Sequence, residues 1–142
     1  MRATPDGRKR RRRNPHVPAE DTGKHLVMTE LLRRGFEAEF AGASYEKHDM
    51  LVRVPGSPSK PIRITTVHSA PWYVRWDLFA KRADQVTVYV LLGAEAVAAA
   101  RFFVVKNSDL ATHLRQPPTW KAFGFIDVQS VEKYEDNWDL LK

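Results

Sequence analysis

The sequence predicts a single α/β domain behind a basic N-terminal tail, with a mixed central sheet flanked by helices. Three patterns predict it: helical apolar spacing over residues 24–34, three successive strand patterns between residues 36 and 67, and an almost continuously apolar run over 85–92. A chain of 142 residues with a hydrophobic content of 43% has enough apolar surface for one packed core. We expect the domain to span residues 19–142 and residues 1–18 to be disordered.

The first half of the domain is expected to form a helix followed by three antiparallel strands. Asp21-Thr22 offers N-cap chemistry, and Gly35 is a typical residue just past a helix end. The helix should bury one stripe of apolar side chains, namely Val27, Met28, Leu31 and Leu32. Period-two alternation and β-branched residues predict strands over 36–40, 48–54 and 62–67, with a Pro- and Gly-rich turn over 55–60.

The second half alternates shorter elements around one central strand. The run over 85–92 is apolar on both faces, as expected for a strand covered on both sides. The other expected elements are a helix over 75–82, a small-residue loop over 93–100, a strand over 101–105, a helix over 107–115, an edge strand over 125–128 and a closing helix over 130–141.

The net charge of +6 is carried by the tail. Residues 1–16 hold seven of the 23 Lys and Arg side chains and one of the 17 acidic ones, a difference equal to the whole net charge. Six of the seven form one run: Arg8, Lys9, Arg10, Arg11, Arg12 and Arg13. Such runs are typical of arms that contact phosphates, and equally of solubilising tails, so both interpretations stay open.

Composition excludes several classes of protein. Without cysteine the chain has no disulfide framework and no zinc-thiolate site. No apolar run reaches the roughly 18 residues of a membrane span, so we expect a cytoplasmic protein, with association with the nucleoid as one option and no membrane partner. The sequence contains no Gly-rich phosphate loop, no His-x-x-x-His pair and no Gly-x-Ser-x-Gly elbow.

The remaining candidates for chemistry follow the predicted order of elements. Glu30 lies on the first helix, Asp49 at the start of the second strand, and Arg63-Ile64-Thr65 on the third strand. The strand period sends Arg63 and Thr65 to one face, with Ile64 on the other.

Three segments with this order, Gly23 to Phe36, His48 to Val52 and Ile62 to Thr66, resemble the PD-(D/E)xK nuclease superfamily. That superfamily has the restriction-endonuclease-like fold shared with archaeal-type Holliday-junction resolvases, and the pattern covers most of residues 22–106. The resemblance implies an αβββαβ core with a mixed central sheet, followed here by a C-terminal helix.

The resemblance also implies a metal site that this sequence matches only in part. It assigns Glu30 and Asp49 as ligands of Mg²⁺, an ion that prefers carboxylate oxygens. Where the family has an acid or amide followed by a catalytic Lys, this chain has Arg63 and Thr65. Arginine cannot bind a cation and threonine carries no charge. Cleavage would then require another cation to replace the missing Lys, and the candidates are Lys60, Lys81 and Arg82.

Each of these residues has an alternative structural explanation. Glu30 could be a solvent-facing helix carboxylate, and Asp49 could cap the start of a strand or form a salt bridge with Arg63. We expect the aromatic cluster Trp72, Tyr73 and Trp76 to belong to the core, although such rings also stack unpaired bases.

Three functional hypotheses follow. The first is a nucleic-acid-binding protein, with DNA as the foremost ligand, that has a degenerate nuclease site and contacts phosphates through the tail, Arg63, Arg75, Lys81 and Arg82. The second is an active Mg²⁺- or Mn²⁺-dependent endonuclease with a relocated lysine, in which Glu30, Asp49, Arg63 and Thr65 surround the reaction. The third is a non-catalytic accessory protein that docks a partner through its acidic final helix. A homodimer is a further expectation from the resemblance.

Overall fold

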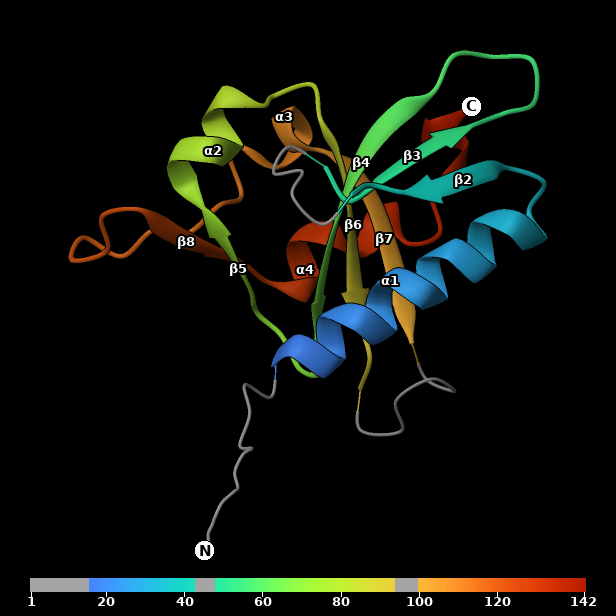
Figure 1. Cartoon of the computed structure of the whole chain (residues 1–142). Helices are drawn as coiled ribbons and strands as arrows, with labels where there is room; N and C mark the ends of the chain where they lie inside the picture. Colours follow the sequence, from blue (N-terminus) through green and yellow to red (C-terminus); the bar gives the residue numbers. More distant parts are fainter. Residues whose placement is uncertain (1–15, 43–47, 94–99) are drawn as a thin grey trace, which may run out of the picture.

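The computed structural model describes residues 16–42, 48–93 and 100–142 (Figure 1). The basic run of the tail and most of the loop predicted over 93–100 lie outside these ranges. The elements are α1 (His16–Arg33), β2 (Glu37–Phe40), β3 (Met50–Arg53), β4 (Lys60–Val67), β5 (Trp72–Arg75), α2 (Trp76–Lys81), β6 (Val86–Leu91), β7 (Arg101–Lys106), α3 (Asn107–Leu110), β8 (Phe123–Ile126), α4 (Val128–Val131) and the 3₁₀ turns η2 (Glu132–Tyr134) and η3 (Trp138–Leu141).

The main sheet has five strands in the order β2-β3-β4-β6-β7. Strands β4 and β6 run parallel, and all other neighbours in this sheet are antiparallel, so the sheet is mixed as predicted. The described pairing of β4 with β3 ends at Ile62, whereas its pairing with β6 continues to Val67. The two hairpin strands therefore separate at Ile62, next to Asp49.

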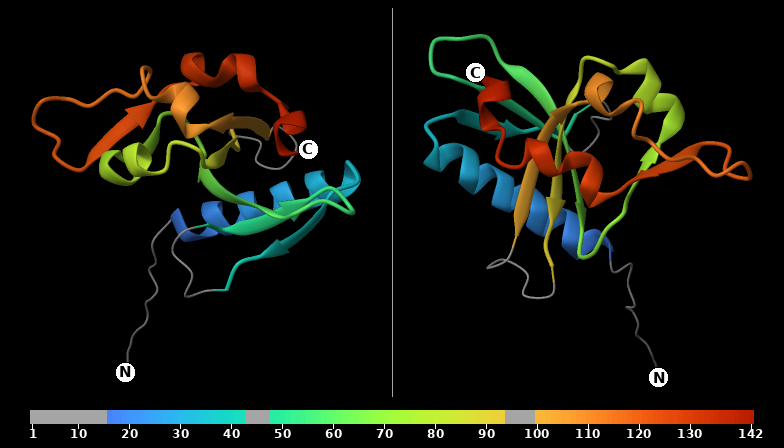
Figure 2. Two further views of the ribbon diagram at one scale, coloured as in Figure 1. Left: turned by 90° about the horizontal axis from the view of Figure 1, so that it is seen from above. Right: turned by 180° about the vertical axis from the view of Figure 1, so that it is seen from behind.

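Alternate residues of β6 enter two separate cores, one on each face of the sheet. Val88 and Val90 pack on the face that α1 covers, together with Val27 and Leu31 of the helix. Tyr89 packs on the other face, where the other buried side chains come from β5, α2, β7, α3, β8 and α4. The two views of Figure 2 show α1 on one side of this sheet and α2, α3, α4 and β8 on the other, whereas Trp138 and Leu141 of η3 belong to the core on the α1 side. The prediction of a strand buried on both faces is confirmed, since all of Val86–Val90 is buried.

Helix α1 is longer than the sequence predicted and its buried stripe is narrower. It begins at His16, inside the range expected for the tail. Pro18 is compatible with this start because it falls in the first turn, where backbone N–H groups have no partner within the helix. Val27 and Leu31 are fully buried, but the prediction that Leu32 is buried was wrong, since its side chain is 55% exposed. One step of about 100° around the helix turns Leu32 away from the sheet.

Close packing of α1 on β4 depends on Gly23. A Cβ atom at this position would lie 1.8 Å from Oγ1 of Thr66. Thr66 is buried, and its Oγ1 is the buried side-chain polar atom without a hydrogen-bond partner among the described residues. The glycine that the sequence placed before the helix thus lies inside it, packed directly against Thr66 of the sheet.

A two-stranded ribbon formed by β5 and β8 was missed by the sequence analysis. Trp72 pairs with Ile126 and Arg75 with Phe123, in antiparallel register. Trp72 and Ile126 are fully buried and face the second core. The short strand β5 was hidden because it runs directly into α2 without a turn between them.

The predicted closing helix over 130–141 was wrong. The chain forms three short helical segments instead, and Asp136 between them has a positive φ of 55° that interrupts any helix. The backbone N–H of Asp136 donates to Phe102 O at 2.8 Å, so the segment is fastened to β7 rather than to itself. No helix in the described part of the chain combines the length and the apolar character that crossing a membrane requires.

Candidate functional site

Asp49 is held at the point where β3 and β4 separate. Its Oδ2 accepts a hydrogen bond from the backbone N–H of Ile64 at 2.8 Å, two residues beyond the last strand pair. Its Oδ1 lies 3.5 Å from Nζ of Lys24 on α1. The carboxylate therefore replaces the missing strand partner of β4 and neutralises a helix lysine. We call Asp49, Lys24 and the Ile64 amide the Asp49 junction.

Glu30 lies away from this junction. Its Oε2 binds Arg33 and Arg34 on the same helix, and Arg34 in turn stacks over Trp138 with 5.4 Å from Cζ to the ring centroid. Six residues separate Lys24 from Glu30, which corresponds to about 9 Å along the helix and a rotation of about 240°. The structure therefore does not bring together the two carboxylates that the resemblance assigned to one metal ion.

The described residues of the Asp49 junction do not fit a Mg²⁺ site. They supply one carboxylate, and both of its oxygens already have a partner. An ammonium group beside a bound cation costs roughly 1–4 kcal/mol per pair of unit charges at about 4 Å. Across the described ranges, no group of three or more His, Asp or Glu side chains is arranged to hold a metal ion.

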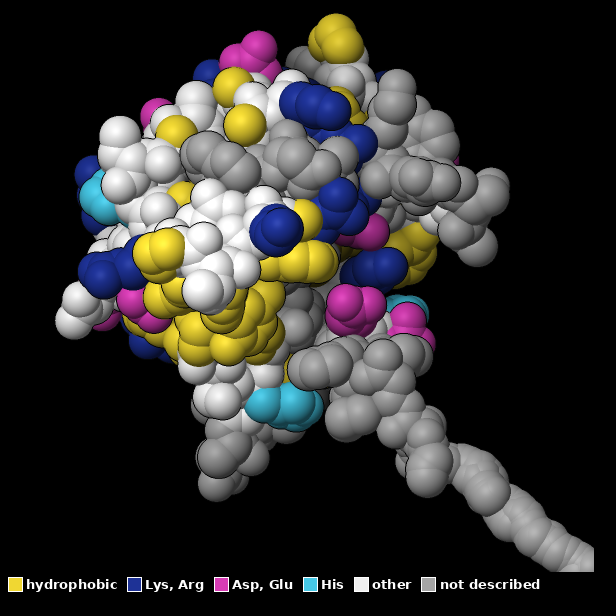
Figure 3. Space-filling model, turned by 90° about the vertical axis from the view of Figure 1, so that its left-hand side faces the viewer, with side chains coloured by type: hydrophobic (Ala, Val, Ile, Leu, Met, Phe, Trp, Pro, Cys, Tyr) yellow, Lys and Arg dark blue, Asp and Glu magenta, His cyan; other side chains and the backbone are white. Residues whose placement is uncertain are grey.

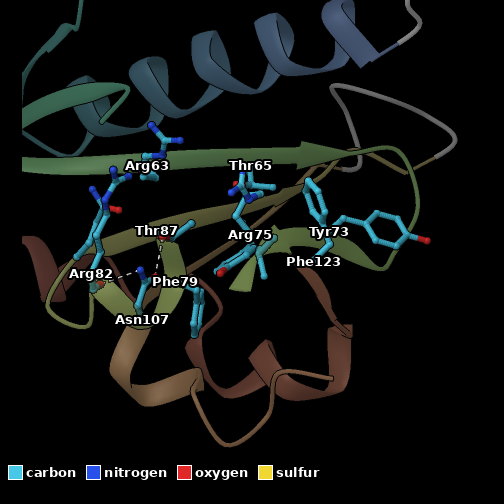
Figure 4. A pocket seen from close by; sticks show the side chains of 12 residues that line it. Arg63, Thr65, Tyr73, Arg75, Phe79, Arg82, Thr87, Asn107 and Phe123 are labelled. Carbon is cyan, nitrogen blue, oxygen red and sulfur yellow. Dashed lines mark hydrogen bonds between the residues drawn. The ribbon is translucent and has the colours of Figure 1, made fainter. Parts of the chain in front are cut away.

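A hollow of about 190 Å³ lies on the face of the sheet opposite α1 and gathers three arginines (Figure 4). They are Arg63 of β4, Arg75 of β5 and Arg82 just after α2. In Figure 4 Arg82 extends toward β4 and Arg75 lies beneath Thr65. None of the described side chains that line the hollow is acidic. We call it the arginine pocket.

Buried hydrogen bonds fix the turn that carries Arg82. Thr87 Oγ1 donates to Asn107 Oδ1 at 2.9 Å, and Asn107 Nδ2 donates to the backbone oxygen of Arg82 at 2.9 Å. Both polar side chains are buried, and Ser108 N–H donates to Ala83 O in the same turn. The pocket is therefore preformed on its α2 side.

The floor of the arginine pocket is uncharged. Burial raises the pKa of the Tyr89 hydroxyl well above its usual range, so this phenol stays neutral at physiological pH. Aromatic side chains of Tyr73, Phe79 and Phe123 complete the walls. Among the described side chains that line the pocket, the charged groups are the three guanidinium groups.

The other predicted residues have different positions. Lys60 Nζ donates to the backbone oxygen of Lys142 at 2.6 Å, so it lies at the far end of the hairpin. Lys81 is exposed at the end of α2, outside the pocket lining. Of the aromatic cluster expected in the core, Trp72 is buried, Tyr73 is 57% exposed, and the side chain of Trp76 is outside the description.

The architecture defines the chain as an α/β protein with the restriction-endonuclease-like fold, as predicted. It is similar to the Holliday junction resolvase Hjc of Archaeoglobus fulgidus, with a TM-score of 0.54, 18% identity and coverage of 80% of this chain and 88% of that one. It is also similar to the bacterial homing endonuclease I-Ssp6803I, with a TM-score of 0.54, 11% identity and coverage of 89% and 91%. No family model and no curated protein matches the sequence.

Lys24 is the junction residue that the sequence analysis missed. A signal for it exists, because Lys24, Val27 and Leu31 have i, i+3 and i+7 spacing and so share the sheet-facing side of α1. A basic residue in line with two buried ones needs a partner on the sheet, and Asp49 is that partner.

Proposed function

We propose that this chain binds DNA through the arginine pocket and does not cleave it by metal-dependent chemistry. The observation that carries the proposal is the convergence of Arg63, Arg75 and Arg82 on one hollow whose described lining has no acidic side chain. Guanidinium groups match phosphate oxygens in charge and in hydrogen-bond geometry. The names of the two similar structures, a Holliday junction resolvase and a homing endonuclease, agree with a nucleic-acid ligand.

The position of Arg63 supports a change from metal binding to phosphate binding. The resemblance implies that this residue occupies a position where nucleases have a metal ligand. In this chain its side chain lines the arginine pocket. An arginine there supplies the positive charge that a metal would otherwise supply. We propose that it contacts a phosphodiester directly, and that the basic run from Arg8 to Arg13 adds sequence-independent contacts.

Salt dependence of binding tests this proposal. For duplex DNA the slope of log K against log salt decreases by about 0.9 for each phosphate that the protein no longer neutralises. We expect the variant R63Q/R75Q/R82Q to bind more weakly and with a slope up to about 2.7 smaller than the wild type. Removal of residues 1–15 should reduce the slope further. The matched control is Arg53→Gln, since Arg53 pairs with Glu37 at the β2–β3 edge, outside the pocket. Equal salt slopes for R63Q/R75Q/R82Q and the Arg53→Gln control would contradict the proposal.

A second candidate function is favoured by the contact between Lys24 and Asp49. A nuclease with a relocated lysine needs an ammonium group next to its hairpin aspartate, and Lys24 Nζ is 3.5 Å from Asp49 Oδ1. Cleavage of supercoiled plasmid with Mg²⁺ or Mn²⁺, abolished in both K24A and D49A, would establish this alternative. Our proposal predicts no cleavage with either metal, alongside intact DNA binding.

A further inference from the structure

Two exposed aromatic side chains and a half-buried one lie at the arginine pocket. Tyr73 of β5 and Phe123 of β8 line that pocket and also line an adjacent apolar hollow with Trp120 and Lys121. Tyr73 is 57% exposed and Phe123 is 48% exposed. We call Tyr73, Trp120 and Phe123 the aromatic platform. Figure 3 shows hydrophobic side chains gathered on this side of the molecule, with Lys and Arg side chains next to them.

The strand period explains why the platform faces outward. Tyr73 and Arg75 alternate with Trp72 and Val74 along β5, and Trp72 is the side chain buried in the second core. Across the ribbon, Phe123 is the direct partner of Arg75. The guanidinium of Arg75 lies over the Phe123 ring, with Cζ 5.5 Å from its centroid. One face of the ribbon therefore presents aromatic rings and a cation side by side.

The platform is held in place before any ligand binds. The Tyr73 and Trp120 rings are tilted by 39° with centroids 6.0 Å apart, and Trp120 packs edge-on against Phe125 at 5.7 Å. Two backbone hydrogen bonds of 2.9 and 2.8 Å join Arg115 to Phe125, and the Gln116 amide donates to Trp120 O and Lys121 O. A preformed surface loses little conformational entropy on binding.

We propose that the aromatic platform stacks an unpaired nucleobase while the arginine pocket binds the phosphate attached to it. This inference rests on the proposed function and adds that the preferred ligand is DNA with unpaired bases. Bases inside a duplex present only their edges, so exposed rings gain stacking only from a base that has left its helix. Lys121 at the outer edge of the platform supplies a cation for the phosphate of the next nucleotide.

Binding measurements with matched ligands test this inference. The ligands are one single strand, its duplex and the RNA strand of the same sequence, each labelled with fluorescein and titrated over a salt series. For Y73A/F123A we expect a loss of about 5- to 150-fold in affinity for either single strand, the range that one base stack supplies. Duplex affinity should fall by a smaller factor than single-strand affinity, since the arginines that contact phosphates remain, and an equal fold loss for duplex and single strand would overturn the stacking.

Controls separate stacking from folding and from a decrease in apolar surface. Tyr73→Phe keeps the ring and should keep wild-type affinity for the single strand, whereas Tyr73→Ser should lose it. Leu32→Ala and Phe40→Ala remove exposed apolar side chains elsewhere and should leave binding unchanged. A 2-aminopurine base in the single strand should lose fluorescence on binding to the wild type and not to Y73A/F123A.

The possible failures are distinguishable. If the wild type binds no nucleic acid, the proposed function fails and this inference fails with it. If it binds duplex and single strand with arginine-dependent salt slopes but Y73A/F123A matches the wild type, only the platform inference is overturned. A second result would also overturn it: the wild type self-associates in sedimentation velocity, and Y73A/F123A is monomeric but binds the single strand with unchanged affinity. The platform would then be an interface between copies of the chain.

Discussion

Lys24 and Asp49 form an ion pair across the helix–sheet boundary, with 3.5 Å between Nζ and Oδ1, although they are 25 residues apart in sequence. The pair joins α1 to the point where β3 and β4 separate. Its aspartate also accepts the Ile64 amide, so one carboxylate serves both the ion pair and the backbone of β4. This arrangement gives Asp49 a structural role that does not depend on a metal ion.

Replacing Lys24 with glutamate should create metal binding at this junction. Two neighbouring carboxylates repel each other, so K24E should be less stable than the wild type without divalent metal. Mn²⁺ binds the folded state and should restore stability, by about 2.7 kcal/mol at a concentration 100 times its Kd. The measurement is the melting temperature with and without Mn²⁺. K24E/D49N, which has one carboxylate fewer, should respond much less, and an equal response would refute the assignment of the site to Asp49.

Loss of the Asp49 carboxylate should destabilise the fold, and the loss should be larger when the Ile64 N–H also loses its acceptor. D49A removes the acceptor of the Ile64 N–H, and an unsatisfied buried donor costs about 1–3 kcal/mol. D49N keeps an oxygen that can accept that N–H and loses only the ion pair with Lys24. Because the Lys24 side chain is 35% exposed, this ion pair contributes less to stability than the hydrogen bond. Urea unfolding should therefore rank the proteins wild type, D49N, D49A in decreasing stability. Equal losses in both variants would show that the hydrogen bond contributes nothing.

Gly23→Ala should weaken the packing of α1 on β4. The added methyl would lie 1.8 Å from Thr66 Oγ1, 2.8 Å from its Cβ and 2.9 Å from its Cγ2, so no rotation of the threonine removes the clash. Overpacking of this kind costs about 1–3 kcal/mol, against a gain of up to about 1 kcal/mol in helix propensity. Gly42→Ala is the control, since no atom of the described residues beyond its chain neighbours lies within 4 Å of its added Cβ. The double variant G23A/T66A should recover part of the loss, and full additivity would contradict the clash.

Stability should fall in acid through the ion pair of Arg101 and Glu135. The hydrogen bonds from Arg101 lower the pKa of the Glu135 carboxyl below its usual range. A lowered pKa in the folded state means that the stabilisation is present above the unfolded pKa of about 4.3 and disappears as pH falls through the folded value. Both side chains are more than one-third exposed, so we expect at most about 1 kcal/mol.

The measurement for this pair is the free energy of unfolding between neutral pH and about pH 3. E135Q should be less stable at neutral pH and should show a smaller decrease in acid than the wild type. Asp109→Asn removes one exposed carboxylate on α3 and should leave the wild-type pH dependence in place. If E135Q and the wild type lose the same amount in acid, the ion pair does not contribute to the pH dependence.

Local patterns in the sequence were sufficient for the order of the main elements. A strand with one face buried alternates in hydrophobicity, and a strand buried on both faces is continuously apolar. Both patterns can be read from neighbouring residues, as in the alternation around Ala38 and Val52, the β-branched run of β4 and the apolar run of β6. The α1–β2–β3–β4 order then carried the resemblance that implied the restriction-endonuclease-like fold. The long closing helix failed because Asp136 bonds to β7, a contact that no local pattern encodes.

For the candidate site, the sequence by itself determined which residues are present: Asp49 on the hairpin, and Arg63 and Thr65 at the positions where the resemblance implies a metal ligand and a lysine. Only the tertiary structure decided their partners. It paired Asp49 with Lys24, left Glu30 with its helix neighbours, and joined Arg63 to Arg75 and Arg82 in one pocket. The physical reason is that charge pairing and pocket formation depend on distances between elements, which follow from how α1 and the β5–β8 ribbon pack on opposite faces of the sheet.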